Sequence, residues 1–287
     1  MFFYCKKAKC LLGKSESSQT DIHCPGCDGE HSVKELEKEG SHVFVFNIEE
    51  QVRRILEDAD THIGLTQRER SVDMSDIEQS KGYGERGLGQ DDISVSWNAD
   101  GVSLYESSQC SIWSNQLQIN ELPLKHRVKR IVLAGLRFGG ENREIDLFLK
   151  PFVHEMNKLS SNGFLWTATD ATRKHTRVLP GQGLVDTVAR CGVMGIMQYN
   201  GTHGCAWWEQ EGKVVPKGKG TTRVYPVQSV NCQLRTDASM RHYVSEAERQ
   251  GQPVMGMTKT SVIFFLAFFK YQLGSYWITC MRYVLVT

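Results

Sequence analysis

DISVSWNADGVSLYESS, residues 92–108, is the stretch of this sequence that decides the expected fold. Residues 93–97 alternate between apolar and polar side chains, which is typical of a β-strand with one buried face. Residues 98–101, NADG, are turn-forming, and apolar residues return from Val102 onward as in a second strand. We therefore expect Asp100 at the point where a strand ends and a turn begins.

The carboxylate of Asp100 has two interpretations. A hard cation such as Mg²⁺ takes oxygen ligands that the scaffold holds in place, and a strand end provides such a position. An aspartate before a glycine also commonly accepts a hydrogen bond from its own backbone in a turn. From the residues alone the second interpretation is the more common one.

The rest of the chain alternates between strand and helix patterns. Strands are expected over 42–46, 111–122, 127–136, 164–167 and 177–185, and helices over 48–56, 144–159 and 188–197. Asn47 is a suitable N-cap for the first helix, and Pro151 inside the second indicates a kink or an entry point. This order predicts an α/β fold that opens with an antiparallel meander.

Composition divides the chain into four parts. Residues 1–35 contain four cysteines, 36–60 form a strand-helix element, and 61–90 are a polar linker with several glycines. The large α/β domain is expected over 91–287.

The nine cysteines bear on the cellular compartment and on metal binding. The first twenty residues contain four lysines and no apolar run followed by a cleavage site, so no secretory signal is expected. Reduced, intracellular thiols follow, and close cysteine pairs then favour metal over disulfide. Cys24 and Cys27 have the spacing that lets two thiols reach one zinc ion, and Gly26 frees the turn between them.

Cys5 and Cys10 form a looser second pair, because Ala8 occupies the position where a tighter pair would have a thiol. His23 and His31 are spare candidates. Unrelated reduced thiols are the alternative to a metal site. We predict a zinc ribbon with structural Zn²⁺ held by Cys5, Cys10, Cys24 and Cys27.

The net charge of +1 does not by itself indicate a nucleic-acid binder. Positive charge is nevertheless clustered, either as a solvated surface or as phosphate contacts. The clusters are Lys125, His126, Arg127, Lys129 and Arg130, then Lys213, Lys217, Lys219 and Arg223.

The C-terminal segment is strongly apolar over 262–269 and uncharged over 271–281. Lys270 and Arg282 interrupt it, so no stretch reaches the roughly 18 apolar residues of a spanning helix. We expect a buried strand or helix, or an altered tail, rather than a membrane anchor.

Several motifs recur in one known family at consistent spacing. They are NADGV at 98–102, SS at 107–108, SIW at 111–113, INELP at 119–123, LAGL at 133–136 and FG at 138–139. In the same register follow FLKPFVHE at 148–155, GIMQYNG at 195–201, GC at 204–205, VPKG at 215–218 and RVYP at 223–226. Over about residues 90–256 the chain resembles the catalytic domain of the CACTA (En/Spm-like) DNA transposases and their animal relatives.

The resemblance implies an incomplete RNase H-like domain of the DDE type, with an insertion from about residue 200. Enzymes of this family use three acidic side chains and two Mg²⁺ ions to direct water or a DNA 3′-hydroxyl onto a phosphodiester. The resemblance places the first acid at Asp100 and the second at Asp186, both as magnesium ligands. The strand before Asp186 is then expected beside the strand bearing Asp100. From the residues alone, Asp186 is also a good helix N-cap.

The family also implies partners and a location. Transposon-end DNA would be the partner, the nucleus the location, and no small molecule the substrate. Family members often carry a zinc ribbon near the N-terminus, as predicted here, and a homo-oligomer is left open.

Three departures from the family bear on activity. Trp208 replaces the second cysteine of a G-C-x-x-C pair, and Asp237 replaces a histidine. The family's D-x-M-H-x-x-L-L segment is ITCMRYVL at 278–285, and its third acid would lie beyond Thr287. We therefore expect a transposase-derived protein that no longer cleaves DNA. The alternative is a non-catalytic zinc-ribbon module that binds nucleic acid or protein.

Overall fold

The computed structural model describes residues 1–14, 20–60, 77, 81–84, 87–103, 111–139, 145–226 and 233–269. The chain divides into two compact units. The first is Met1–Gly181 with Leu266–Phe268, and the second is Gln182–Phe265 with Phe269–Thr287. Most of the linker expected over 61–90 lies outside the described residues, apart from the short helix α4 (Lys81–Gly84) and residues 87–90. No helix among the described residues is long and apolar enough to cross a membrane.

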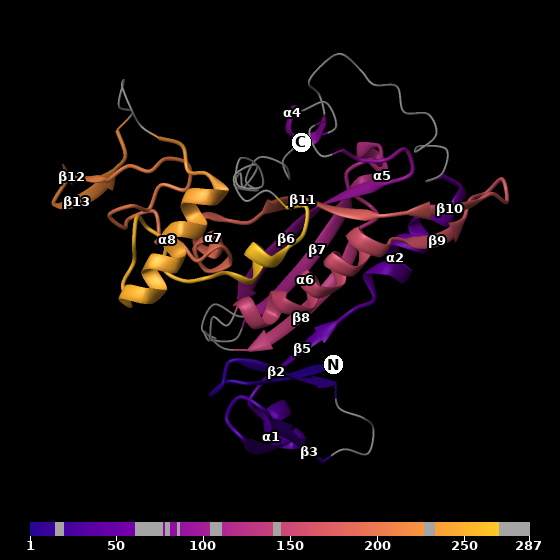
Figure 1. Ribbon diagram of the computed structural model, residues 1–287, viewed down its shortest axis with the longest axis horizontal. Helices are drawn as coiled ribbons and strands as arrows, with labels where there is room; N and C mark the ends of the chain where they lie inside the picture. The colour runs from indigo at the N-terminus through magenta and orange to yellow at the C-terminus, as the bar shows by residue number, and fades with distance from the viewer. Residues whose placement is uncertain are drawn as a thin grey trace. The chain divides into compact units, whose positions relative to one another are not determined.

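A mixed seven-stranded sheet is the centre of the first unit (Figure 1). Its strands, in spatial order, are β11 (Val178–Leu184), β6 (Ile93–Ser103), β7 (Ser111–Ile119), β8 (Val132–Gly139), β5 (His42–Val45), β1 (Phe2–Cys5) and β2 (Cys10–Lys14). Strands β6, β7 and β8 pair antiparallel, so the expected α/β fold with an antiparallel meander is confirmed.

The prediction of a turn at residues 98–101 is wrong. β6 runs through this segment without a break, and Asp100 lies opposite Ser114 of β7 in a ladder that extends to Ser103. Gly101 is needed for close packing, because a Cβ there would lie 2.5 Å from the ring of Trp113. The NADG segment therefore forms a tightly packed part of strand β6 and does not reverse the direction of the chain.

β11 lies beside β6, as expected for the strand that precedes Asp186. Ile93, the first residue of β6, donates its N–H to the carbonyl of Arg177, immediately before β11, over 3.0 Å. The two strands therefore start at the same end of the sheet and run parallel. Arg177 also forms an ion pair with Asp92, which joins the two strand starts.

Helix α6 (Ile145–Asn162) packs on the sheet and confirms the helix expected over 144–159. The rings of Trp97 in β6 and Phe152 in this helix lie 5.6 Å apart. Pro151 is in the interior of α6, so the entry-point interpretation is wrong. The preceding segment also differs from its prediction: residues 124–127 form helix α5 (Leu124–Arg127), and β8 starts only at Val132.

Helix α2 (Ile48–Glu57) begins as predicted, with the Asn47 side chain accepting from the Glu50 N–H. The side chain of Gln51 in this helix makes hydrogen bonds to strand β8 that a neighbouring strand would otherwise make. The side-chain amide donates to the carbonyl of Leu133 over 2.9 Å and accepts from the Leu133 N–H over 3.0 Å. This is the place where the β7–β8 register shifts, so the side chain satisfies backbone groups that the ladder leaves open.

The remaining elements of the first unit are short. They are two two-stranded sheets, β3 (Asp21–Cys24) with β4 (Gly29–Ser32) and β9 (Phe164–Thr167) with β10 (Arg173–Thr176), and helix α1 (Val33–Lys38).

The second unit holds helices α7 (Thr187–Met194) and α8 (Asp237–Gln250), hairpin β12 (Lys213–Lys217) with β13 (Gly220–Val224), and the 3₁₀ helix η2 (Val262–Phe265). Buried Arg235 connects three of its segments by donating to the carbonyls of Cys205, His203 and Met255. Ile263 and Phe264 are buried, as expected for the apolar segment; residues after 269 lie outside the described chain.

Candidate metal centre

Two hairpins bring the N-terminal cysteines together. Cys5 ends β1 and Cys10 begins β2, directly opposite each other in the ladder. Cys24 ends β3, Cys27 lies in the turn that follows, and His31 lies in β4. Because the end of one hairpin meets the end of the other, residues far apart in sequence converge at one point.

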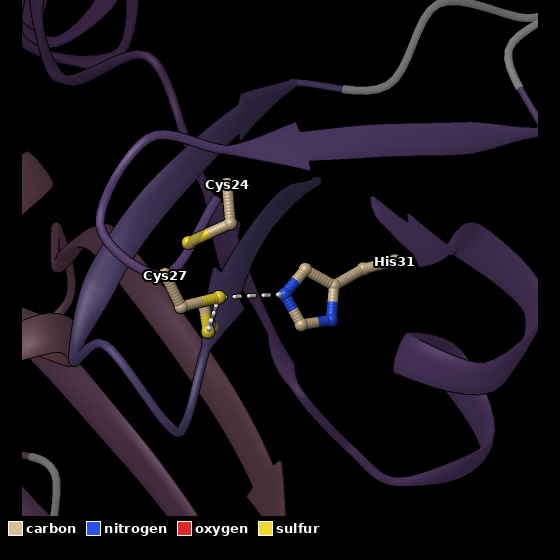
Figure 2. Close-up of side chains that lie close together, drawn as sticks. Cys24, Cys27 and His31 are labelled. Atoms are coloured by element: carbon tan, nitrogen blue, oxygen red, sulfur yellow. Dashed lines mark hydrogen bonds between the residues drawn. The ribbon is translucent and has the colours of Figure 1, made fainter. Parts of the chain in front are cut away.

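Four side chains form a compact donor group: Cys5, Cys24, Cys27 and His31, whose sulfur and nitrogen atoms all lie within 4.8 Å of one another. The ring of His31 is directed at the Cys27 sulfur, with 3.6 Å between Nε2 and Sγ (Figure 2). Cys5 Sγ lies 3.7 Å from Cys27 Sγ. Cys5 and Cys24 are buried, whereas Cys27 and His31 are half-buried.

These distances suit a tetrahedral metal ion. With zinc–sulfur bonds of about 2.3 Å and zinc–nitrogen bonds of about 2.1 Å, two sulfurs lie about 3.8 Å apart and a sulfur and a nitrogen about 3.6 Å apart. The 3.7 Å and 3.6 Å separations match both values. Three thiols and one imidazole are also a donor set that zinc commonly takes in structural sites. The group could hold a metal ion such as zinc.

The thiols influence one another's ionisation. Burial raises the pKa of Cys24, but hydrogen bonds from the Cys10 thiol and from backbone N–H groups outweigh it and lower that pKa to about 6. Burial and the hydrogen bond to Cys24 raise the pKa of Cys10. The hydrogen bond to Cys24 and burial raise the pKa of Cys27. One thiolate is thus favoured at Cys24, and a cation is needed to offset the repulsion when its neighbours also ionise.

The local backbone is shaped for this convergence. The Ala8 N–H donates to Cys5 Sγ over 3.3 Å, as in a metal-binding knuckle. A side chain at position 26 would lie 2.7 Å from the Cβ of Ala8, so only Gly26 lets the two hairpins approach this closely. Asp28, just after Cys27, has a left-handed φ of 56° that closes the second turn.

Three of the four predicted zinc ligands, Cys5, Cys24 and Cys27, belong to the group. The fourth donor within the group is His31, while Cys10 lies outside it with its sulfur 3.4 Å from that of Cys24. His23 contacts the carboxylates of Glu30 and Asp28 instead. The spacing of Cys27 and His31, four residues apart across the start of β4, was the sequence signal for His31.

The two acidic residues expected to bind Mg²⁺ lie elsewhere. Asp100 is in β6 of the first unit, and its Oδ1 accepts from the Gly101 N–H over 2.8 Å. Asp186 is in the second unit and caps α7, with Oδ1 accepting from the Ala189 N–H over 2.5 Å. The backbone-bonding interpretation of Asp100 and the N-cap interpretation of Asp186 are therefore both confirmed.

Cys205, which the resemblance would place in a G-C-x-x-C pair, accepts through Sγ from the Trp208 N–H over 3.4 Å. Trp208 pairs with Leu234 in an isolated bridge. A backbone N–H thus bonds the Cys205 sulfur as in a metal-binding knuckle, and Trp208 occupies the position where the resemblance would place a second thiol.

Comparison with known proteins adds no assignment: no protein-family model matches this sequence, and the search of curated proteins gives no match.

Proposed function

We propose that this chain is derived from a cut-and-paste DNA transposase and carries an RNase H-like domain. The strand order is the observation that supports this most. In an RNase H-like fold, three antiparallel strands are followed by a helix and by a fourth strand, which pairs in parallel with the first. β6, β7, β8, α6 and β11 occur in this order along the chain, with α5 between β7 and β8 and the β9–β10 hairpin between α6 and β11, and β11 lies next to β6.

The positions of two carboxylates agree with this proposal. Asp100 lies in β6, and Asp186 follows the end of the neighbouring strand β11 by two residues, where it caps α7. Carboxylate oxygens are the donors that Mg²⁺ prefers. In the proposed ancestral reaction, Asp100 and Asp186 would be magnesium ligands, and the bound metal would supply activation of the attacking oxygen and stabilisation of the leaving oxygen of a phosphodiester.

The proposal does not include DNA cleavage by this chain. The segment ITCMRYVL at 278–285 lacks the aspartate and the histidine of the family's D-x-M-H segment. We expect metal binding to survive in weakened form and phosphoryl transfer to be lost.

Manganese binding tests the ligand roles. Electron paramagnetic resonance would measure Mn²⁺ affinity in the purified chain and in the Asp100→Asn, Asp186→Asn and Asp60→Asn variants. Asp60 is an exposed aspartate outside both strands and serves as the matched control. We expect about tenfold weaker binding, or more, for the first two variants only. Equal Mn²⁺ affinity in all four proteins would show that neither Asp100 nor Asp186 is a metal ligand.

A plasmid-nicking assay tests the lost activity. Incubation of the chain with supercoiled DNA and Mg²⁺ or Mn²⁺ should yield no nicked product. Nicking that disappears in Asp100→Ala would show that the chain is still an active nuclease.

The cysteine cluster favours a second candidate, a zinc-stabilised module that binds nucleic acid or protein without catalysis. The match between the sulfur–nitrogen separation of 3.6 Å and tetrahedral zinc supports it. Zinc content and DNA affinity would be measured before and after chelation. Less than half an equivalent of zinc, or unchanged DNA affinity after its removal, would count against this candidate.

A further inference from the structure

The β12–β13 hairpin of the second unit is exposed on both faces. Seven of its ten strand residues are exposed and the other three are half-buried. The strands are joined by residues 218–219, and Gly218 has a left-handed φ of 58° that a two-residue loop of this kind requires. The hairpin therefore has two strand faces and a tip from which side chains reach solvent.

The charge of the hairpin has one sign. Residues 213–226 contain no aspartate or glutamate, and the nearest preceding acid is Glu211. The cations are Lys213, Lys217, Lys219 and Arg223. All three lysines are exposed, and none of the ion pairs among the described residues includes them.

The base of the hairpin is fixed by hydrogen bonds. Arg223 donates to the carbonyls of Gly212 over 2.7 Å and Asn200 over 3.1 Å. The Tyr225 hydroxyl accepts from the Gly204 N–H over 2.8 Å. Arg223 is thus used within the unit, while the lysines remain on an anchored strand pair. A preorganised basic surface loses less entropy on binding than a flexible tail does.

The spacing of the lysines suits a duplex. Lys213 and Lys217 are four residues apart on one strand, so they share a face and lie about 14 Å apart along it, and Lys219 is at the tip. The major groove of B-DNA is about 12 Å wide and admits a two-stranded ribbon. The deep, narrow major groove of A-form RNA does not admit side chains in this way.

We propose that the β12–β13 hairpin is a DNA-binding arm whose Lys213, Lys217 and Lys219 contact backbone phosphates of duplex DNA. This deepens the proposed function, on which it rests only for the choice of DNA as the polyanion. The three lysines act through charge and position, so the contact is independent of sequence.

Salt dependence is the direct test. Fluorescence anisotropy would measure the affinity of the full chain for a labelled duplex over a range of salt concentrations, without added Mg²⁺. Each lysine that neutralises one phosphate contributes about 0.9 to the slope of log affinity against log salt. The variant K213Q/K217Q/K219Q should therefore lower the slope by roughly 2 to 3, and the affinity at moderate salt by tenfold or more.

Two matched variants keep this result interpretable. K34Q/K38Q/K150Q removes the same charge from exposed lysines outside the hairpin and should leave the slope within about one unit of the parent. K213R/K217R/K219R keeps the charge and should bind like the parent. An equal loss in K34Q/K38Q/K150Q, or an unchanged slope in K213Q/K217Q/K219Q, would overturn the proposal.

Competing ligands test the choice of partner. Tighter binding to duplex RNA of the same sequence, or to phosphatidylserine vesicles, would overturn DNA as the ligand. The manganese experiment separates the two proposals. Suppose that Mn²⁺ affinity is unchanged in Asp100→Asn and Asp186→Asn, while K213Q/K217Q/K219Q still lowers the slope of log DNA affinity against log salt. The DNA-binding arm would then be supported and the nuclease ancestry refuted.

Discussion

Replacing His31 by alanine should weaken zinc binding strongly, whereas replacing Cys10 by serine should not. The basis is geometric: His31 Nε2 belongs to the group of donors within 4.8 Å, and Cys10 Sγ does not. Binding of structural zinc contributes about 10–16 kcal/mol, so one of four ligands contributes about 2.5–4 kcal/mol. His31→Ala should then lower zinc affinity by roughly 100- to 1,000-fold. For Cys10→Ser the change should stay below about tenfold, because serine keeps a hydrogen-bonding group beside Cys24.

Competition against a chromophoric chelator would measure these affinities. Replacement of zinc by Co²⁺ adds an independent count, since the intensity of sulfur-to-metal charge transfer rises with the number of thiolate ligands. His23→Ala is the matched histidine control, because His23 contacts Glu30 and Asp28 and not the cluster. Loss of zinc in Cys10→Ser with retention in His31→Ala would refute the geometric argument and establish the four-cysteine set.

Two further predictions concern the sheet. Gly101→Ala should destabilise the fold by about 1–3 kcal/mol, since the new Cβ would meet the Trp113 ring; urea unfolding measures this, and an unchanged midpoint would contradict the packing argument. Burial tends to raise the pKa of Asp92, but hydrogen bonds from Arg177 and from the Gly89 N–H outweigh it and hold the pKa below its ordinary value of 3.8. A depressed pKa stabilises the fold above the unfolded-state pKa, and the gain is lost as pH falls through the folded-state value. Asp92→Asn should therefore reduce the loss of thermal stability below about pH 4, and an identical pH profile would show that the pair contributes nothing.

Local periodicity predicted the elements whose signal is contained in their own residues. The Asn47 cap and the apolar spacing over 48–56 gave α2 its correct start, and the broad apolar face over 144–159 predicted α6. α8 was missed although its signal was present: Thr236 and Ser239 form a capping box, and Met240, Val244 and Ala247 are buried at helical spacing.

Contacts between segments distant in sequence determine the structure at the positions where the local sequence pattern predicted it wrongly. NADG has turn chemistry, but β7 pairs with every residue from Val95 to Ser103, and those ladder bonds outweigh the local turn preference. The donor group likewise depends on how two hairpins meet. Cysteine spacing identified Cys24 and Cys27, whereas the choice between Cys10 and His31 depends on a contact between segments that are adjacent only in the folded chain.

The metal cluster and the large sheet share a strand, which limits how the protein can be cut into fragments. β1 carries Cys5 at its end and pairs along its other edge with β5, which in turn pairs with β8. A fragment of residues 1–35 would separate β1 from β5, leaving one half of the cluster without its lateral support. The complementary fragment would expose the edge of β5, an open row of backbone donors and acceptors prone to join another molecule. A stable N-terminal fragment should therefore retain β5, and a stable C-terminal one should have that edge covered.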